Sequence, residues 1–108
     1  MQQDDNQINE PPNELDGAKV IRWAWSGGKP FGLIPIVNSD SRDPIEIYGL
    51  AICQYDDSDD VYRFSCDKNW EVQQDGSYDS IDDALRQLPD QCKLVIAKWR
   101  TKAPHEPI

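Results

Sequence analysis

A run of polar, turn-forming residues, 56–60 (DDSDD), separates two segments with the composition of β-strands. Residues 45–55 are mostly apolar on both alternating faces, and in residues 61–66 Tyr62 and Phe64 alternate with polar side chains. Because the connection between the two segments has the length of a hairpin loop, we expect them to pair as antiparallel strands. The sequence therefore predicts an antiparallel sheet in which residues 45–55 form one long central strand, covered on both faces.

Four further segments have strand-like composition and are separated by turns rich in Gly, Pro, Asn or Asp: residues 18–25, 31–37, 70–73 and 93–99. In the first of these, Trp23 and Trp25 are expected on one face of the strand and Val20 on the other. Pro35 has no backbone N–H, which confines the second segment to a sheet edge. We expect a turn at residues 75–76 to follow the third segment.

One helix is predicted, over residues 80–88. Its apolar side chains recur at i, i+3, i+4 and i+7 and form one stripe, made of Ile81, Ala84, Leu85 and Leu88. Asp79 or Ser80 can cap its first turn, and Pro89 ends it. A helix of this length covers only part of a sheet of about six strands, so we expect an aromatic patch to stay partly exposed.

The fold class that follows is α+β: a single small domain with a bent antiparallel sheet of about five to six strands and one short helix packed on one face. We expect this domain to span residues 18–100. Residues 1–17 are rich in Gln, Asn, Asp and Pro and predict a disordered acidic arm. Residues 101–108 predict a flexible tail.

The charge of the chain excludes several classes of partner. It has 20 acidic and 11 basic residues, with a net charge of -9. Such a surface repels both the phosphate backbone of nucleic acids and anionic membranes, so we expect neither as a partner. The chain has no apolar run that could span a bilayer, and its first residues lack the pattern of a secretory signal. We therefore expect a cytoplasmic protein, unless an export signal has been removed.

The three cysteines predict reduced thiols. Cys53, Cys66 and Cys92 are an odd number and show no CxxC spacing, although a disulfide between two of them stays open. A zinc site is disfavoured because His105 is the only histidine. We expect no metal and no cofactor.

Among metals, calcium is the one for which the sequence contains the most candidate ligands. Oxygen ligands alternate from Asp56 onward, and Asp67 stands where a calcium loop has its last ligand. Val61, however, takes the place of the glycine that such a loop requires, and it begins a predicted strand. The sequence therefore favours hydrated turn carboxylates over a calcium site.

No arrangement typical of an enzyme is present. A Ser or Cys nucleophile needs a nearby base, and the single histidine lies in the Pro-containing tail. The carboxylates lie on expected turns and on a solvated helix face rather than in a cleft. Residues 26–29 (SGGK) lack the spacing of a phosphate-binding loop and predict a hairpin turn instead. We expect a protein that is not an enzyme.

Residues 56–90 concentrate the acidic charge, with eleven Asp or Glu residues and three basic ones. Such a segment steers a basic partner, which aromatic side chains then anchor. In size, acidity and lack of catalytic residues, the chain resembles the immunity and antitoxin proteins that inhibit basic enzymes. We interpret it as a non-enzymatic acidic protein-interaction domain with a basic protein partner. The candidate contact residues are Asp56, Asp57, Asp59, Asp60, Glu71, Asp75, Asp79, Asp82 and Asp83, with Trp23 and Trp25.

Two other classes of function stay open. A small structural or self-associating assembly domain could pair through the sheet edge that contains Pro35, so the sequence allows a monomer or a weak homodimer. A metal-binding or small-molecule-binding module would show a higher melting temperature with its ligand.

Overall fold

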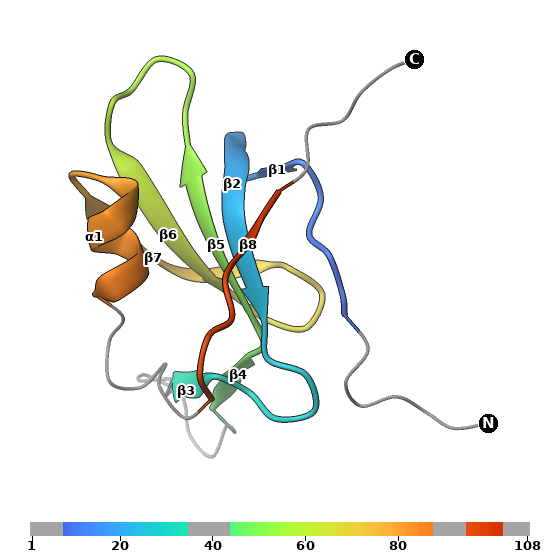
Figure 1. The fold of residues 1–108 in the computed structure, drawn as a ribbon. Helices are drawn as coiled ribbons and strands as arrows, with labels where there is room; N and C mark the ends of the chain where they lie inside the picture. The colour runs from blue at the N-terminus through green and yellow to red at the C-terminus, as the bar shows by residue number, and fades with distance from the viewer. Residues whose placement is uncertain (1–7, 35–43, 88–94, 103–108) are drawn as a thin grey trace.

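The hairpin expected around residues 56–60 forms the centre of the sheet (Figure 1). The computed structural model describes residues 8–34, 44–87 and 95–102 of the 108-residue chain. In these ranges it contains the strands and the helix that follow: β1 (Glu14–Leu15), β2 (Ala18–Trp25), β3 (Gly32–Ile34), β4 (Ile45–Ile47), β5 (Gly49–Gln54), β6 (Val61–Cys66), β7 (Val72–Tyr78), α1 (Ile81–Arg86) and β8 (Arg100–Thr101).

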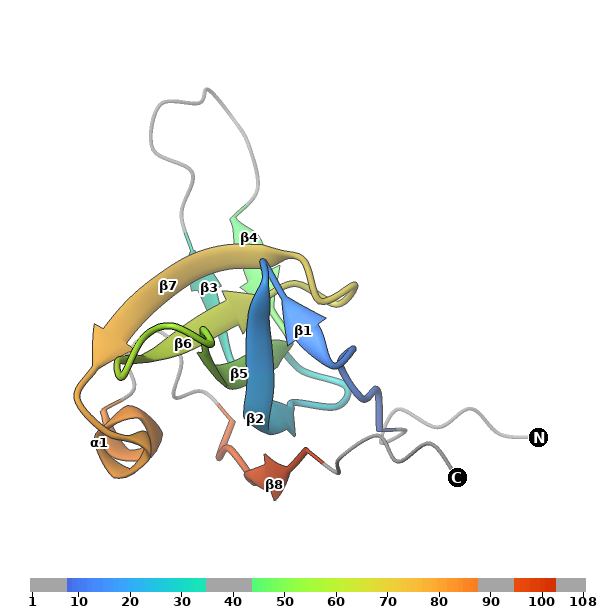
Figure 2. The same ribbon diagram turned by 90° about the horizontal axis from the view of Figure 1, so that it is seen from above.

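The main sheet has the strand order β1-β2-β5-β6-β7, and β8 also pairs with β2. All of its strand pairs are antiparallel. The sheet is curled, and Figure 2 shows β7 arching over the other strands. β3 and β4 form a separate two-stranded sheet. The predicted fold class, an α+β domain with a bent antiparallel sheet and one short helix, is confirmed.

A bulge in β2 changes which of its residues share a face. The register with β5 shifts between Val20 and Arg22. Because one extra residue reverses the alternation of side chains, Val20 lies in the same buried cluster as Trp23 and Trp25. The prediction that Trp23 and Trp25 share a face is confirmed, whereas the prediction that Val20 lies on the other face is wrong.

Residues 45–55 form two strands rather than one. The strand is interrupted at Tyr48. β4 pairs with β3, and β5 belongs to the main sheet. Gly49 is the first residue of β5, and the ring of Trp70 packs directly on it, at a place where a Cβ would approach the ring to 2.5 Å. The turn after β2 therefore leads into the second sheet, and residues 26–30 do not close a hairpin, because β2 and β3 are not paired.

β7 runs through the position at which the sequence predicted a turn. Gly76 pairs with Arg63 of β6, and the missing side chain leaves space for those of Arg63 and Tyr78. The predicted strand at residues 70–73 also begins too early, since β7 begins at Val72. Trp70 has a φ of 63° and lies in the turn before β7.

The two ends of the described chain add strands to β2. β1 pairs with the first residues of β2, so the sheet begins before Ala18. The last predicted strand is displaced: β8 pairs with β2 at Arg22 and Trp23, while residues 95–99 form no strand. The Lys102 ammonium lies 2.8 Å from the Glu10 carboxylate, which joins the two ends. Other parts of the sequence-based expectations concern residues that the structure does not describe: 1–7, 35–37, 93–94 and 103–108.

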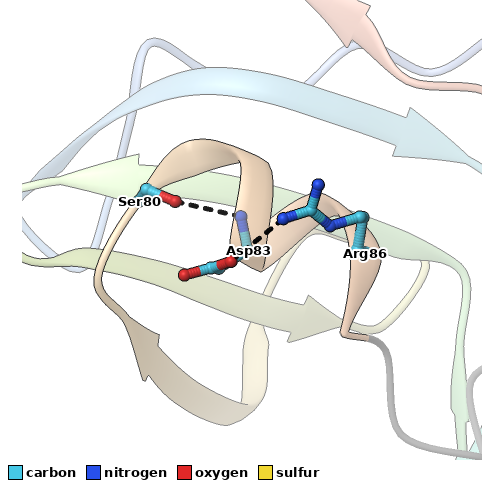
Figure 3. Close-up of polar contacts among 3 residues, drawn as sticks. All are labelled: Ser80, Asp83 and Arg86. Atoms are coloured by element: carbon cyan, nitrogen blue, oxygen red, sulfur yellow. Dashed lines mark hydrogen bonds and ion pairs between the residues drawn. The ribbon is translucent and has the colours of Figure 1, made fainter.

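Helix α1 has the predicted cap and is shorter than predicted. The Ser80 hydroxyl accepts a hydrogen bond from the Asp83 backbone N–H at 3.1 Å, and the Arg86 guanidinium lies 3.2 Å from the Asp83 carboxylate (Figure 3). Ala84 is buried against Ile52 and Val61 on the face of the sheet that the helix covers. The end of the predicted stripe, Leu88, lies outside the described residues.

The opposite face of the sheet carries the aromatic core. Trp23 and Phe64 are buried there with both described cysteines, and Trp70 lies over them. The ring centroids of Trp23 and Trp70 are 6.4 Å apart in an edge-to-face arrangement, a favourable geometry for two aromatic rings.

Candidate functional site

Two acidic segments meet at one end of the sheet. Val61, the first residue of β6, is paired with Tyr78, the last residue of β7. The turn that precedes Val61 therefore lies beside the segment that follows Tyr78 and enters α1, as Figures 1 and 2 both show. We call this region the acidic end, made of Asp56, Asp57, Asp59, Asp60, Asp79, Asp82 and Asp83.

Backbone and hydroxyl contacts fix the shape of the turn in the acidic end. The Ser58 backbone N–H donates to the Tyr55 carbonyl at 3.2 Å, and the Ser58 hydroxyl accepts from the Asp60 N–H at 3.0 Å. The Gln54 side chain donates to the Asp59 carbonyl at 3.3 Å. All four Asp side chains of the turn are exposed. The turn is thus held by groups other than its carboxylates, which are available to a partner.

The acidic end has little compensating positive charge among the residues that the structure describes. Arg86 of α1 pairs with Asp83, an exposed contact that contributes little to stability. Arg63 is nearby in sequence but is buried on β6. Asp82 and Asp83 lie in the first turn of α1, where the helix dipole favours negative charge. The net charge of this end is therefore strongly negative.

The other predicted contact residues lie elsewhere. β7 has seven residues and spans roughly 20 Å, so Glu71 before it lies at the opposite end of the sheet from Asp79. Asp75 is exposed in the middle of β7. Trp23 is only 5% exposed, and Trp25 lies at the far end of β2 from the acidic end. These separations depend on strand register, which could not be predicted from the sequence.

A tyrosine pair that the sequence analysis missed flanks the acidic turn. Tyr55 and Tyr62 are half-buried, and their ring centroids are 5.4 Å apart in an edge-to-face arrangement. The Tyr55 hydroxyl donates to the Asp16 carbonyl at 3.2 Å, which ties the β1–β2 turn to this end. The available signal was their position, since Tyr55 directly precedes residues 56–60 and Tyr62 follows them closely.

The resemblance of residues 56–67 to a calcium loop is not realised. β6 separates Asp67 from the acidic turn. One Asp67 carboxylate oxygen accepts from the backbone N–H groups of Asn69 and Glu71, at 2.8 and 3.0 Å, and so holds the turn before β7. Within residues 8–34, 44–87 and 95–102, no three His, Cys, Asp or Glu side chains are grouped as a metal ion requires.

The two described cysteines are free thiols buried in the aromatic core. Burial, with a smaller effect from the Asp16 charge, raises the pKa of Cys53 to about 12. Burial is also the main reason that the pKa of Cys66 is raised. Because the thiolate is the reactive form, neither group is suited to act as a nucleophile at neutral pH.

Comparisons with known proteins give no further identification: no protein-family model matches the chain, and no curated protein or solved structure is significantly similar to it. In the part of the chain that the structure describes, no helix has the length and apolar character needed to cross a membrane.

Proposed function

We propose that this chain is a non-enzymatic interaction domain that binds a basic protein through the acidic end. The observation that carries the proposal is the pairing of Val61 with Tyr78, which brings the β5–β6 turn beside the start of α1. Seven Asp side chains are gathered in this way, and the exposed Arg86 of α1 is paired with one of them, Asp83.

The binding would proceed by charge steering followed by burial of aromatic surface. Clustered carboxylates raise the rate of encounter with a basic surface, most strongly at low salt. The half-buried Tyr55 and Tyr62 would then anchor the contact, since tyrosine is enriched among residues that dominate binding energy. A basic enzyme inhibited by this domain, as in immunity and antitoxin pairs, fits this chemistry. We place the binding in the cytoplasm, where the buried thiols would stay reduced.

The test compares two variants with the same change in charge. Asp56→Asn and Asp57→Asn together neutralise part of the acidic turn. The control, Glu46→Gln with Glu71→Gln, removes two exposed carboxylates outside the acidic end.

Each protein is immobilised, exposed to lysate, and eluted in salt steps that are read by mass spectrometry. The wild type and the control should retain a basic protein that elutes at raised salt, and the acidic-end variant should lose it. Equal retention by all three proteins, or no retained basic protein, would contradict the proposal.

Self-association is the second candidate, and one observation favours it. β7 ends the main sheet, so its outer edge forms no strand pair among the described residues. Antiparallel pairing of two β7 strands about their centre would place Asp75 opposite its own copy, where like charges repel. Light scattering should therefore give a monomer for the wild type at neutral pH. A salt-independent wild-type dimer at neutral pH would favour this candidate over the acidic-end interaction.

A further inference from the structure

A cavity of about 240 Å³ lies at the other end of β2 from the acidic end. Lys19, near the start of β2, is paired with Gln54 beside the acidic turn, whereas Trp25 at its end lines the cavity. The remaining walls come from distant parts of the chain, with Ile8 on one side and residues 95–100 on another.

The cavity gathers apolar side chains that the fold leaves exposed. Ile96 is 83% exposed and Ile8 is 46% exposed. In the described ranges only one other large hydrophobic side chain, that of Leu33, is exposed, and it does not line this cavity. The indole of Trp25 supplies a further apolar surface and is itself held by Trp70, with ring centroids 5.7 Å apart. An apolar group could therefore be covered here without rearrangement of the core.

The same cavity carries two cations. Lys98 and Arg100 both line it, and neither forms an ion pair with another described residue. The Arg100 guanidinium lies over the ring of Trp23, with its carbon 5.7 Å from the ring centroid, which holds the group near β2. In a chain with a net charge of -9, a cavity with two cations and no carboxylate among its described lining residues is a local reversal of charge.

We propose that this cavity binds an organic acid: a single carboxylate attached to a compact apolar body. The carboxylate would contact Lys98 and Arg100, and the apolar body would pack on Trp25, Ile8 and Ile96. The cavity is smaller than the ~300–1,000 Å³ of sites that take drug-sized ligands, so the apolar body has about the size of a phenyl ring or a branched aliphatic side chain. A free acid and the carboxyl terminus of a peptide with an apolar last residue share this chemistry. The site is independent of the proposed binding of a basic protein.

The experiment measures binding of phenylacetate by tryptophan fluorescence and by amide chemical shifts, with phenylacetamide as the uncharged analogue. A tetrapeptide ending in leucine is tested as the free acid and as the amide. Loss of a charge-assisted contact corresponds to a decrease of about tenfold or more in affinity. Each amide should therefore bind at least about tenfold more weakly than its acid.

A pair of double variants tests where the acid binds. Lys98→Gln with Arg100→Gln should weaken phenylacetate binding about tenfold or more. The matched control, Lys19→Gln with Arg86→Gln, removes one Lys and one Arg outside the cavity and should leave the affinity unchanged. Ile96→Ser is a second variant, at a lining side chain that is 83% exposed, and it should also weaken binding if the first double variant fails to fold.

The outcomes separate the two sources of ligand. Binding of phenylacetate without the peptide identifies a small-acid site, and binding of the peptide acid alone identifies a peptide-terminus site. Equal affinity for acid and amide, equal loss in the cavity and control variants, or no binding of either acid would overturn the proposal.

Discussion

The acidic end and the cavity lie at opposite ends of the same sheet, and they are assembled in different ways. The acidic end comes from two neighbouring stretches of sequence, residues 56–60 and 79–83, joined by a short antiparallel unit. The cavity combines Ile8, Trp25 and Arg100, which are distant in sequence. The acidic end adds solvated charge to turns that other groups hold in place, whereas the cavity includes Trp25, whose ring packs on Trp70 of the core. Substitutions at the two ends should therefore differ in their effect on stability.

The largest effect is expected beneath the cavity. Trp70 contacts both Trp23 and Trp25 and packs on Gly49. Trp70→Ala should lower the free energy of unfolding by about 3–5 kcal/mol, because it opens a void in the aromatic core. Urea denaturation measures the loss, and Trp70→Leu serves as a milder variant if the Ala variant does not fold. A loss no larger than that of an exposed Asp59→Ala would show that the cavity does not depend on the core.

The next test concerns the support of the acidic end. The Tyr78 hydroxyl accepts a hydrogen bond from the buried Arg63 and donates one to the Gln87 carbonyl at 3.1 Å, which joins β7 to the end of α1. Tyr78→Phe should lower the free energy of unfolding by about 1–3 kcal/mol, since a buried charged donor loses its acceptor. Tyr62→Phe is the control, because that hydroxyl makes no hydrogen bond within the described part of the chain. Equal losses in the two variants would contradict this role of Tyr78.

The core between the two ends should be sensitive to alkaline pH. In the folded protein the pKa of Cys53 is raised from 9.0 to about 12, so the unfolded chain releases this proton first. The stabilisation is fully present below pH 9 and is lost as the pH rises toward 12, with a loss of about 1 kcal/mol at pH 10. Unfolding of the wild type and of Cys53→Ala is compared at pH 8 and pH 10. If the free energy of unfolding of the wild type decreased no more between pH 8 and pH 10 than that of Cys53→Ala, the pKa of Cys53 would not be raised in the folded protein.

The smallest effects distinguish two kinds of carboxylate. Asp67 accepts two backbone hydrogen bonds in the turn before β7, so Asp67→Ala should cost about 1 kcal/mol. Asp59 is exposed in a turn that other groups hold, so Asp59→Ala should change the stability by less than about 0.5 kcal/mol. Thermal unfolding at low and high salt measures both. If Asp59→Ala lowered the stability more than Asp67→Ala does, the charges of the acidic end would support the fold.

The elements predicted well are those that depend on neighbours in sequence. The β5–β6 hairpin follows from the acidic turn between two apolar segments, and the start of α1 follows from the capping residue Ser80 and the spacing of its apolar side chains. The acidic turn itself was also identified. Its approach to residues 79–83 follows from the length and register of β7, which the sequence did not predict.

The errors arise where a distant residue decides the local conformation. Gly76 reads as a turn residue, yet the pairing of β7 with β6 and the side chain of Arg63 beside it make it part of a strand. Trp70 adopts a positive φ, which is unusual for a bulky residue, and its ring is buried in the core. The cavity was not predicted for the same reason, because its described lining residues come from three separate parts of the sequence: Ile8, residues 25–27 and residues 95–100.

The pairing of β8 with β2 has a consequence for the order of folding. Two residue pairs, the bond from the Lys102 N–H to the Ile21 carbonyl and the contact of Arg100 with the Trp23 ring hold these strands together, and they close a very long loop. Contacts of such sequence separation form late and open at a lower free energy than the central hairpin does. Undocking of β8 would carry away Arg100 and remove one side of the cavity while β5 and β6 stay paired. Ligand binding and β8 docking are thereby linked, and hydrogen exchange at Lys102 should be faster than in β5 and should slow when an organic acid is bound.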